Sequence, residues 1–289
     1  MTTAPAVTTH QEFSFTDEDF RALAQLARAQ FGLSLAESKK PLVYSRLARR
    51  LRARNICRFD DYMSLLDIPD EQDERLQLIS ALTTNVTSFF REKHHFQTLR
   101  EIVLPRLASR RRLRIWSAGC STGQEAYSIA MTLLEALPDA GSRDIRILAT
   151  DIDPAVVERA KVGSYAVEDI ENLPAEMRRA WTRASPETAG KSEIAAEVKR
   201  MISFGELNLV DPWPFHGPFD AIFCRNVAIY FDQETQQRLW QRFAGMLDDG
   251  GYLFIGHSER VSGPALQALE TAGVTTYRKK QDTLGVTRT

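Results

Sequence analysis

The sequence predicts an α/β fold with a parallel sheet covered by helices on both faces, preceded by an all-helical domain. From about residue 113, short apolar segments typical of strands alternate with segments of helical periodicity. The first 85 residues carry helical patterns alone. The 289 residues are 43% hydrophobic and 26% charged, enough to bury a core, which excludes disordered, collagen-like and coiled-coil classes.

We expect the helical domain to span residues 13–85. Thr16 has the character of a helix N-cap followed by acidic residues, and that helix should end at Gly32. Pro41 can open a second helix, and further helical patterns cover 59–66 and 71–82. Residues 86–112 are expected to be a linker.

The remaining residues, 113–289, should form the α/β domain. Strands are expected at 113–117, 144–151, 201–208, 220–227 and 251–257, and helices at 124–137, after Pro154 and at 233–247. Residues 275–280 could add an antiparallel edge strand, and the polar, poorly periodic residues 163–200 are expected to be an insertion.

Charge and cysteine content restrict the function classes. The formal net charge of −1 argues against a general nucleic-acid binder. No apolar run approaches the roughly 20 residues of a membrane helix, and the N-terminus lacks the pattern of a secretory signal. Three scattered cysteines predict neither a disulfide framework nor a zinc knuckle, so a reducing cytoplasm is expected.

One helix is unusually basic. Eight basic residues and no acidic one lie between Lys39 and Arg58. Arg46, Arg50 and Arg54, called the arginine stripe below, share one helical face, opposite Leu47 and Leu51. Such a face is either solvated surface or a docking surface for an acidic partner.

The turn after the first strand has the composition of a nucleotide-binding loop. Gly119 and Gly123 allow a ligand to approach the backbone, and Asp151, at the end of the second strand, can accept hydrogen bonds from ribose hydroxyls. A tight strand-to-helix connection is the alternative. The loop is not G-x-G-x-x-G, and Glu125 at the helix start favours a cofactor with a cationic amino group over a dinucleotide.

Three motifs together resemble the CheR family of chemotaxis receptor methyltransferases, over nearly the whole chain. They are Thr-Asn-Val-Thr-Ser-Phe-Phe-Arg-Glu at 84–92, the loop and helix at 116–129, and Pro-Phe-Asp-Ala-Ile-Phe-Cys-Arg-Asn-Val-Ala-Ile-Tyr-Phe-Asp at 218–232. Gly-His-Ser-Glu at 256–259 is also similar.

This resemblance implies a Rossmann-like sheet that binds S-adenosylmethionine, with the helical N-terminal domain and a small β-subdomain at 163–200. It implies a protein-glutamate O-methyltransferase that leaves S-adenosylhomocysteine as its product. The expected partners are the cytoplasmic helices of methyl-accepting chemotaxis receptors, with no nucleic acid and no insertion into the membrane. The expected location is the cytoplasm.

The resemblance also assigns residues by motif position. Those expected to contact the cofactor are Asn85, Thr87, Arg91, Glu125, Asp151, Asn208, Leu209, Arg225 and Asn226. Arg91 and Tyr230 would be catalytic and face the transferred methyl group and the incoming carboxylate. The arginine stripe would recognise an acidic receptor helix. For Arg91 and Tyr230 the alternatives are an ion pair between domains and a buried structural tyrosine.

Other residues and functions receive less support. The adjacent His94 and His95 are expected to point in different directions, so no metal site is expected, and Cys120 and Cys224 should be small buried residues. Alternative functions are a methyltransferase of the same fold acting in another signalling array or on nucleic acid, and a cofactor-sensing adaptor without turnover. The segment Cys-Arg-Asn-Val-Ala-Ile-Tyr-Phe at 224–231 lacks the Asn/Asp-Pro-Pro-Tyr/Phe motif common among amino-methylating nucleic-acid enzymes.

Overall fold

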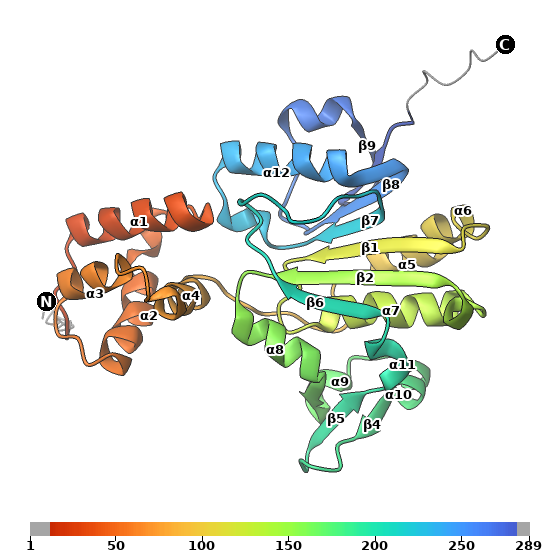
Figure 1. Ribbon diagram of the computed structural model, residues 1–289, viewed down its shortest axis with the longest axis horizontal. Helices are drawn as coiled ribbons and strands as arrows, with labels where there is room; N and C mark the ends of the chain where they lie inside the picture. The colour runs from red at the N-terminus through yellow and green to blue at the C-terminus, as the bar shows by residue number, and fades with distance from the viewer. Residues whose placement is uncertain (1–11, 282–289) are drawn as a thin grey trace, which may run out of the picture. The chain divides into compact units, whose positions relative to one another are not determined.

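The computed structural model describes residues 12–281 and divides the chain into two compact units, with the boundary between Thr84 and Asn85. Figure 1 shows the helical first unit and the sheet-containing second unit. Among the described residues, no helix has both the length and the apolar character needed to cross a membrane.

The first unit is helical, as expected. Thr16 caps its first helix through a reciprocal capping box with Asp19, and Gly32 ends that helix with a left-handed φ of 70°. Apolar residues on the inner faces, among them Leu23, Leu47 and Leu78, are fully buried and form the core. The elements are α1 (Asp17–Phe31), η1 (Glu37–Lys39), α2 (Lys40–Ala53), α3 (Phe59–Leu66) and α4 (Gln72–Leu82).

The second unit contains a seven-stranded sheet in the order β6-β2-β1-β7-β8-β10-β9. The first five strands in that order are parallel, whereas β10 runs antiparallel to both of its neighbours, β8 and β9. The strands are β1 (Arg112–Ala118), β2 (Asp144–Asp151), β6 (Ile202–Glu206), β7 (Phe219–Cys224), β8 (Leu247–Ile255), β9 (Leu269–Gly273) and β10 (Thr276–Lys279). The carboxyl ends of the parallel strands meet at one edge, where α/β folds bind ligands.

Helices cover both faces of this sheet. On β1, Ile115 belongs to the apolar cluster that includes Tyr127 and Ile129 of α7 (Gln124–Ala136). The next residue, Trp116, points to the other face, where its ring lies 5.2 Å from that of Phe243 in α12 (Gln233–Met246). This alternation along one strand is the α/β arrangement that the sequence predicts. Two further short elements, η3 (Ala140–Ser142) and α8 (Pro154–Val162), flank β2 in sequence.

Two expectations about the chain path are corrected. Residues 275–280 form β10, but β10 is an inner strand, because β9 pairs along its free side and takes the edge. Residues 86–112 are more than a linker, because Phe89, Phe96 and Leu99 are buried in the core of the second unit. This segment forms α5 (Lys93–Thr98), the π-helical turn η2 (Leu99–Val103) and α6 (Leu104–Arg106).

The insertion folds into a separate three-stranded antiparallel sheet in the order β3-β5-β4. Its elements are β3 (Ser164–Ala166), α9 (Val167–Ile170), α10 (Ala175–Trp181), β4 (Thr182–Ala184), β5 (Lys191–Ile194) and α11 (Ala196–Lys199). The Tyr165 hydroxyl of β3 donates a hydrogen bond of 2.6 Å to the carbonyl of Thr122. The small sheet therefore supports the loop between β1 and α7.

Candidate active site

The loop between β1 and α7 is held close to two other segments. The N–H groups of Gly119 and Cys120 both donate to the Thr150 carbonyl, at 2.8 and 2.9 Å, and so fix the loop to the end of β2. Gly119 has a φ of 86°, and a Cβ on it would lie 2.2 Å from Cγ2 of Val227 in the turn after β7. Only glycine allows this backbone conformation and this close approach.

Asp151 ends β2 and organises the same edge of the sheet. Its carboxylate accepts hydrogen bonds from the backbone N–H groups of Ser121, at 2.8 Å, and Asp153, at 3.1 Å. Burial raises the pKa of Asp151, although these hydrogen bonds partly oppose the shift. Asp153 itself caps α8 by accepting from the Ala155 N–H at 2.9 Å. Asp151 is therefore not the helix cap, and its remaining lone pairs are available to a ligand.

Glu125 lies in the first turn of α7 and is held by two donors. The Ser117 hydroxyl donates to one carboxylate oxygen at 2.7 Å, and Nη1 of Arg225 donates to the other at 2.9 Å. Arg225 is buried, with 7% of its surface exposed. Arg225 is therefore a buried ion-pair partner of Glu125.

Arg225 also reaches the motif at 84–92. Its Nη2 donates to the carbonyl of Arg91 and lies 3.3 Å from Oε2 of Glu92. Burial alone would raise the pKa of Glu92, but the Arg225 guanidinium and hydrogen bonds from His257 outweigh it and lower that pKa. One guanidinium thus joins two carboxylates from different motifs.

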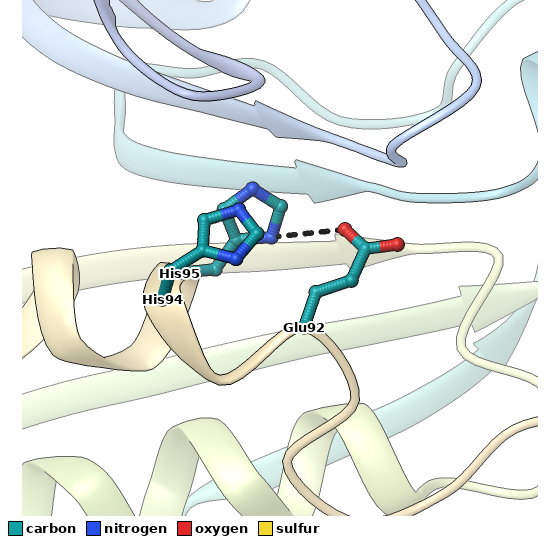
Figure 2. Close-up of side chains that lie close together, drawn as sticks. All are labelled: Glu92, His94 and His95. Carbon is teal, nitrogen blue, oxygen red and sulfur yellow. Dashed lines mark ion pairs between the residues drawn. The ribbon is translucent and has the colours of Figure 1, made fainter.

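Glu92 lies near three histidines, of which Figure 2 shows His94 and His95 on one side of its carboxylate. Nδ1 of His257 lies 3.0 Å from Oε1 of Glu92, and Nδ1 of the fully buried His95 lies 3.5 Å from Oε2. The other ring nitrogen of His95 lies 2.8 Å from the Thr275 hydroxyl. Burial lowers the pKa of His95 to about 3, so the ring is neutral at physiological pH.

The expectation that His94 and His95 point apart is wrong. Their ring centroids lie 4.1 Å apart, and their ligand atoms lie within 4.8 Å of each other and of a Glu92 oxygen. This spacing could suit a metal ion. However, Arg225 lies 3.3 Å from the Glu92 oxygen that faces His95, so a metal cation would meet a fixed positive charge. The chemistry of the cluster therefore favours an ion-pair network.

The turn after β7 carries Asn226 and Tyr230. Asn226 has a left-handed φ of 60°, and Tyr230 ends the short helix η4 (Ala228–Tyr230). Glu259 accepts hydrogen bonds from the backbone N–H groups of Asn226, at 3.0 Å, and Ile229, at 3.2 Å. Glu92, His257 and Glu259 lie within motifs recognisable in the sequence, but only their contacts in the structure indicate what they do.

The other residues expected at the site lie around this edge. The backbone carbonyl of Asn85 accepts a hydrogen bond of 3.2 Å from the Ser121 hydroxyl. Thr87, two residues further along the chain, is half-buried. Nη1 of Arg91 donates to the Val86 carbonyl at 2.9 Å. The structure thus connects Asn85 to the glycine loop and Arg91, through its carbonyl, to Arg225.

The segment after β6 also reaches this edge. The Leu207 N–H donates to the Asp151 carbonyl at 2.8 Å, so Asn208 and Leu209 follow directly beside the end of β2. Arg242 of α12 donates to the Leu209 carbonyl at 2.6 Å and stacks 3.8 Å from the Trp213 ring. Leu209 is also one of the residues lining a cavity of about 310 Å³ beside α12.

The expectation of a free cationic face on α2 is wrong. Arg46 donates to the carbonyls of Ala81, Leu82 and Thr83, at 3.0 to 3.1 Å, at the end of α4. Arg50 and Arg54 pair with acidic residues instead.

Arg50 forms a two-pronged ion pair with the buried Glu74, at 2.6 and 2.9 Å, and Arg54 pairs with Glu71 at 2.7 Å. The segment from Lys39 to Arg58 contains no acidic residue, and the acidic partners of these arginines lie in α4 and directly before it. The arginine stripe therefore holds α2 to α4.

Both cysteines near the site are buried, as expected. Cys120 and Cys224 are 1% and 0% exposed, and burial raises the pKa of both thiols. Neither has the lowered pKa of a reactive thiolate.

Comparison with known proteins agrees with this architecture. The model of the CheR methyltransferase all-alpha domain matches residues 18–83, and that of the CheR methyltransferase SAM-binding domain matches residues 85–278. These two ranges meet at the boundary between the structural units.

Similar proteins have consistent names. A probable chemotaxis protein methyltransferase of Rhizobium etli is 48% identical, covering 88% of this chain and 97% of that protein. Chemotaxis protein methyltransferase 2 of Pseudomonas aeruginosa is 44% identical, covering 93% and 95%. The chemotaxis protein methyltransferase of Escherichia coli is 42% identical, covering 87% of each. From its two matched domains and these relatives, the chain belongs to the CheR family of S-adenosylmethionine-dependent methyltransferases.

Proposed function

We propose that this chain transfers a methyl group from S-adenosylmethionine to glutamate side chains on the cytoplasmic helices of methyl-accepting chemotaxis receptors. One observation supports this most strongly. The Glu92–Arg225–Glu125 network joins three sequence motifs of the family, at 84–92, 116–129 and 218–232, near the carboxyl ends of the parallel strands. Glutamate methyl esters and S-adenosylhomocysteine are then the products.

The residues at this edge suit the cofactor. The Gly119 backbone permits close approach, Asp151 retains acceptor capacity for ribose hydroxyls, and Glu125 offers negative charge to an amino group. Asn85, Thr87, Asn208, Leu209 and Asn226 would contact the cofactor at this edge. Arg225 supports this site by holding Glu125, and its burial gives it little surface for direct contact.

The reaction places modest demands on the protein. The bound cofactor supplies an electrophilic methyl group, and a glutamate carboxylate with a pKa of about 4.3 is already ionised at neutral pH, so no general base is needed. The protein must align the carboxylate and exclude water. Arg91 would orient the carboxylate without fully neutralising it, and the Tyr230 hydroxyl would donate a hydrogen bond that aims it.

A transfer assay tests this proposal. The purified chain, radiolabelled S-adenosylmethionine and receptor cytoplasmic fragments should give labelled receptor whose label is released by mild base, as expected of a carboxylic ester. Fragments with the methylation-site glutamates replaced by alanine are the matched control. Label that is stable to base, or that appears equally in the alanine-substituted fragments, would contradict the proposal.

A further inference from the structure

The turn after β7 has a backbone conformation that requires support. Asn226 has a φ of 60°, in the left-handed region that among side-chain-bearing residues Asn adopts most readily, and the turn there is stable only if its backbone N–H groups are satisfied. The same turn continues into η4, which ends at Tyr230. The position of the Tyr230 side chain therefore depends on contacts that hold this turn in place.

Glu259 provides such contacts from a distant segment. One oxygen of its carboxylate accepts from the N–H groups of Asn226, at 3.0 Å, and Gly256, at 2.6 Å. The other oxygen accepts from the Ile229 N–H at 3.2 Å. One carboxylate thus holds both ends of the turn between Asn226 and Ile229, together with the end of β8.

The fit between the two segments is close. A Cβ on Gly256 would lie 2.5 Å from Nδ2 and 2.7 Å from the backbone nitrogen of Asn226. With three N–H donors aimed at it, the Glu259 side chain must act as an acceptor on both oxygens. Glutamine, which has one acceptor oxygen and an NH₂ group, cannot reproduce this arrangement.

We infer that Glu259 is a positioning residue for methyl transfer, which holds the Asn226–Tyr230 turn so that Tyr230 faces the reacting carboxylate. This inference rests on the proposed function, because it gives Tyr230 a role in that reaction. Glu259 itself acts through the backbone of the turn.

Hydrogen exchange tests the structural part without any receptor. In the wild-type protein the amides of Asn226 and Ile229 should be protected. Glu259→Gln should speed their exchange roughly tenfold, the effect of losing a hydrogen bond of about 1.4 kcal/mol, while the Ile222 amide inside β7 remains unchanged. Unprotected amides in the wild-type protein would overturn the inference even if the variant failed to fold.

Kinetics test the functional part. Glu259→Gln should lower kcat for receptor methylation by about tenfold to a hundredfold through misalignment, and Glu259→Asp should lose less. Because Glu259 acts through Tyr230, combining Glu259→Gln with Tyr230→Phe should cost no more than the worse single change. Glu158→Gln, at a side chain 66% exposed on α8, is the matched control and should leave kcat unchanged.

The outcomes separate the two proposals. Additive losses in the double variant, or unchanged kcat in Glu259→Gln, would overturn the role of Glu259. A wild-type protein that methylates no receptor would contradict the proposed function, and normal amide protection in that protein would still support the contacts of Glu259.

Discussion

Individual residues at the site take their roles from partners far away in the sequence. The position of Asp151 at a strand end is readable from the sequence, and the structure shows that Asp153, two residues further on, caps the following helix. The role of Arg225 was harder to predict, because its partners Glu92 and Glu125 lie a hundred or more residues earlier. Family motifs identify such residues, but their pairing depends on the fold.

The neutral state of the buried His95 predicts how the stability of the protein depends on pH. Its pKa is lowered from 6.5 to about 3 in the folded protein, so below pH 6.5 the unfolded chain binds a proton that the folded chain does not. Stability should therefore fall as the pH falls, by about 1–2 kcal/mol between pH 7 and pH 5 from this residue. Denaturant unfolding of the wild-type protein and of His95→Gln measures it. Equal pH dependence in both would contradict the assignment.

Tyr230→Phe tests the proposed catalytic hydroxyl. The change removes one oxygen with little change in volume, so affinity for S-adenosylmethionine should persist while kcat falls about tenfold or more. Calorimetry measures the affinity, and the receptor assay measures the rate. Lost cofactor binding with a normal rate at saturation would assign Tyr230 to the cofactor instead.

At the scale of elements, periodicity predicted most helices and parallel strands to within a few residues. The starts of α7 and α12, at Gln124 and Gln233, are as expected. The sequence did not reveal β9, because Leu-Glu-Thr-Ala-Gly has few residues typical of strands. It also did not reveal that the arginine stripe faces α4. The periodicity of a helix indicates which residues share a face, but not which other element packs against that face.

The contacts of the arginine stripe with α4 predict an effect on stability. Arg50→Met keeps the apolar stem but leaves Glu74, which is 1% exposed, without its main counter-charge. The free energy of unfolding of the helical unit should fall by about 3 kcal/mol. Arg49→Met, on the exposed side of the same helix, should change it by less than about 0.5 kcal/mol. Similar losses in both variants would contradict the pairing as the cause.

The whole molecule consists of two compact units, and its sequence predicted both kinds of architecture. The order of strands could not be predicted, because the position of β10 inside the sheet depends on pairing with β9 across a turn. Because each unit is compact in itself, we expect the two units to unfold in separate transitions.

Scanning calorimetry of the full chain tests this separation. We expect two transitions, of which Arg50→Met lowers only that of the helical unit. S-adenosylhomocysteine at a hundred times its Kd should stabilise the second unit by about 2.7 kcal/mol and raise only its transition. A single transition that responds as a whole to both changes would show that the units unfold together.

The strand β9 affects whether the sheet can pair with a strand from another chain. An open sheet edge exposes unpaired backbone groups that can recruit a strand from another chain. Here the edge is only five residues long, carries Glu270 in an ion pair of 2.6 Å with Arg278, and has a shift of register in its pairing with β10. A short, charged and irregular edge is a poor template for pairing with a strand of another chain, so at this edge the sheet is protected against such pairing.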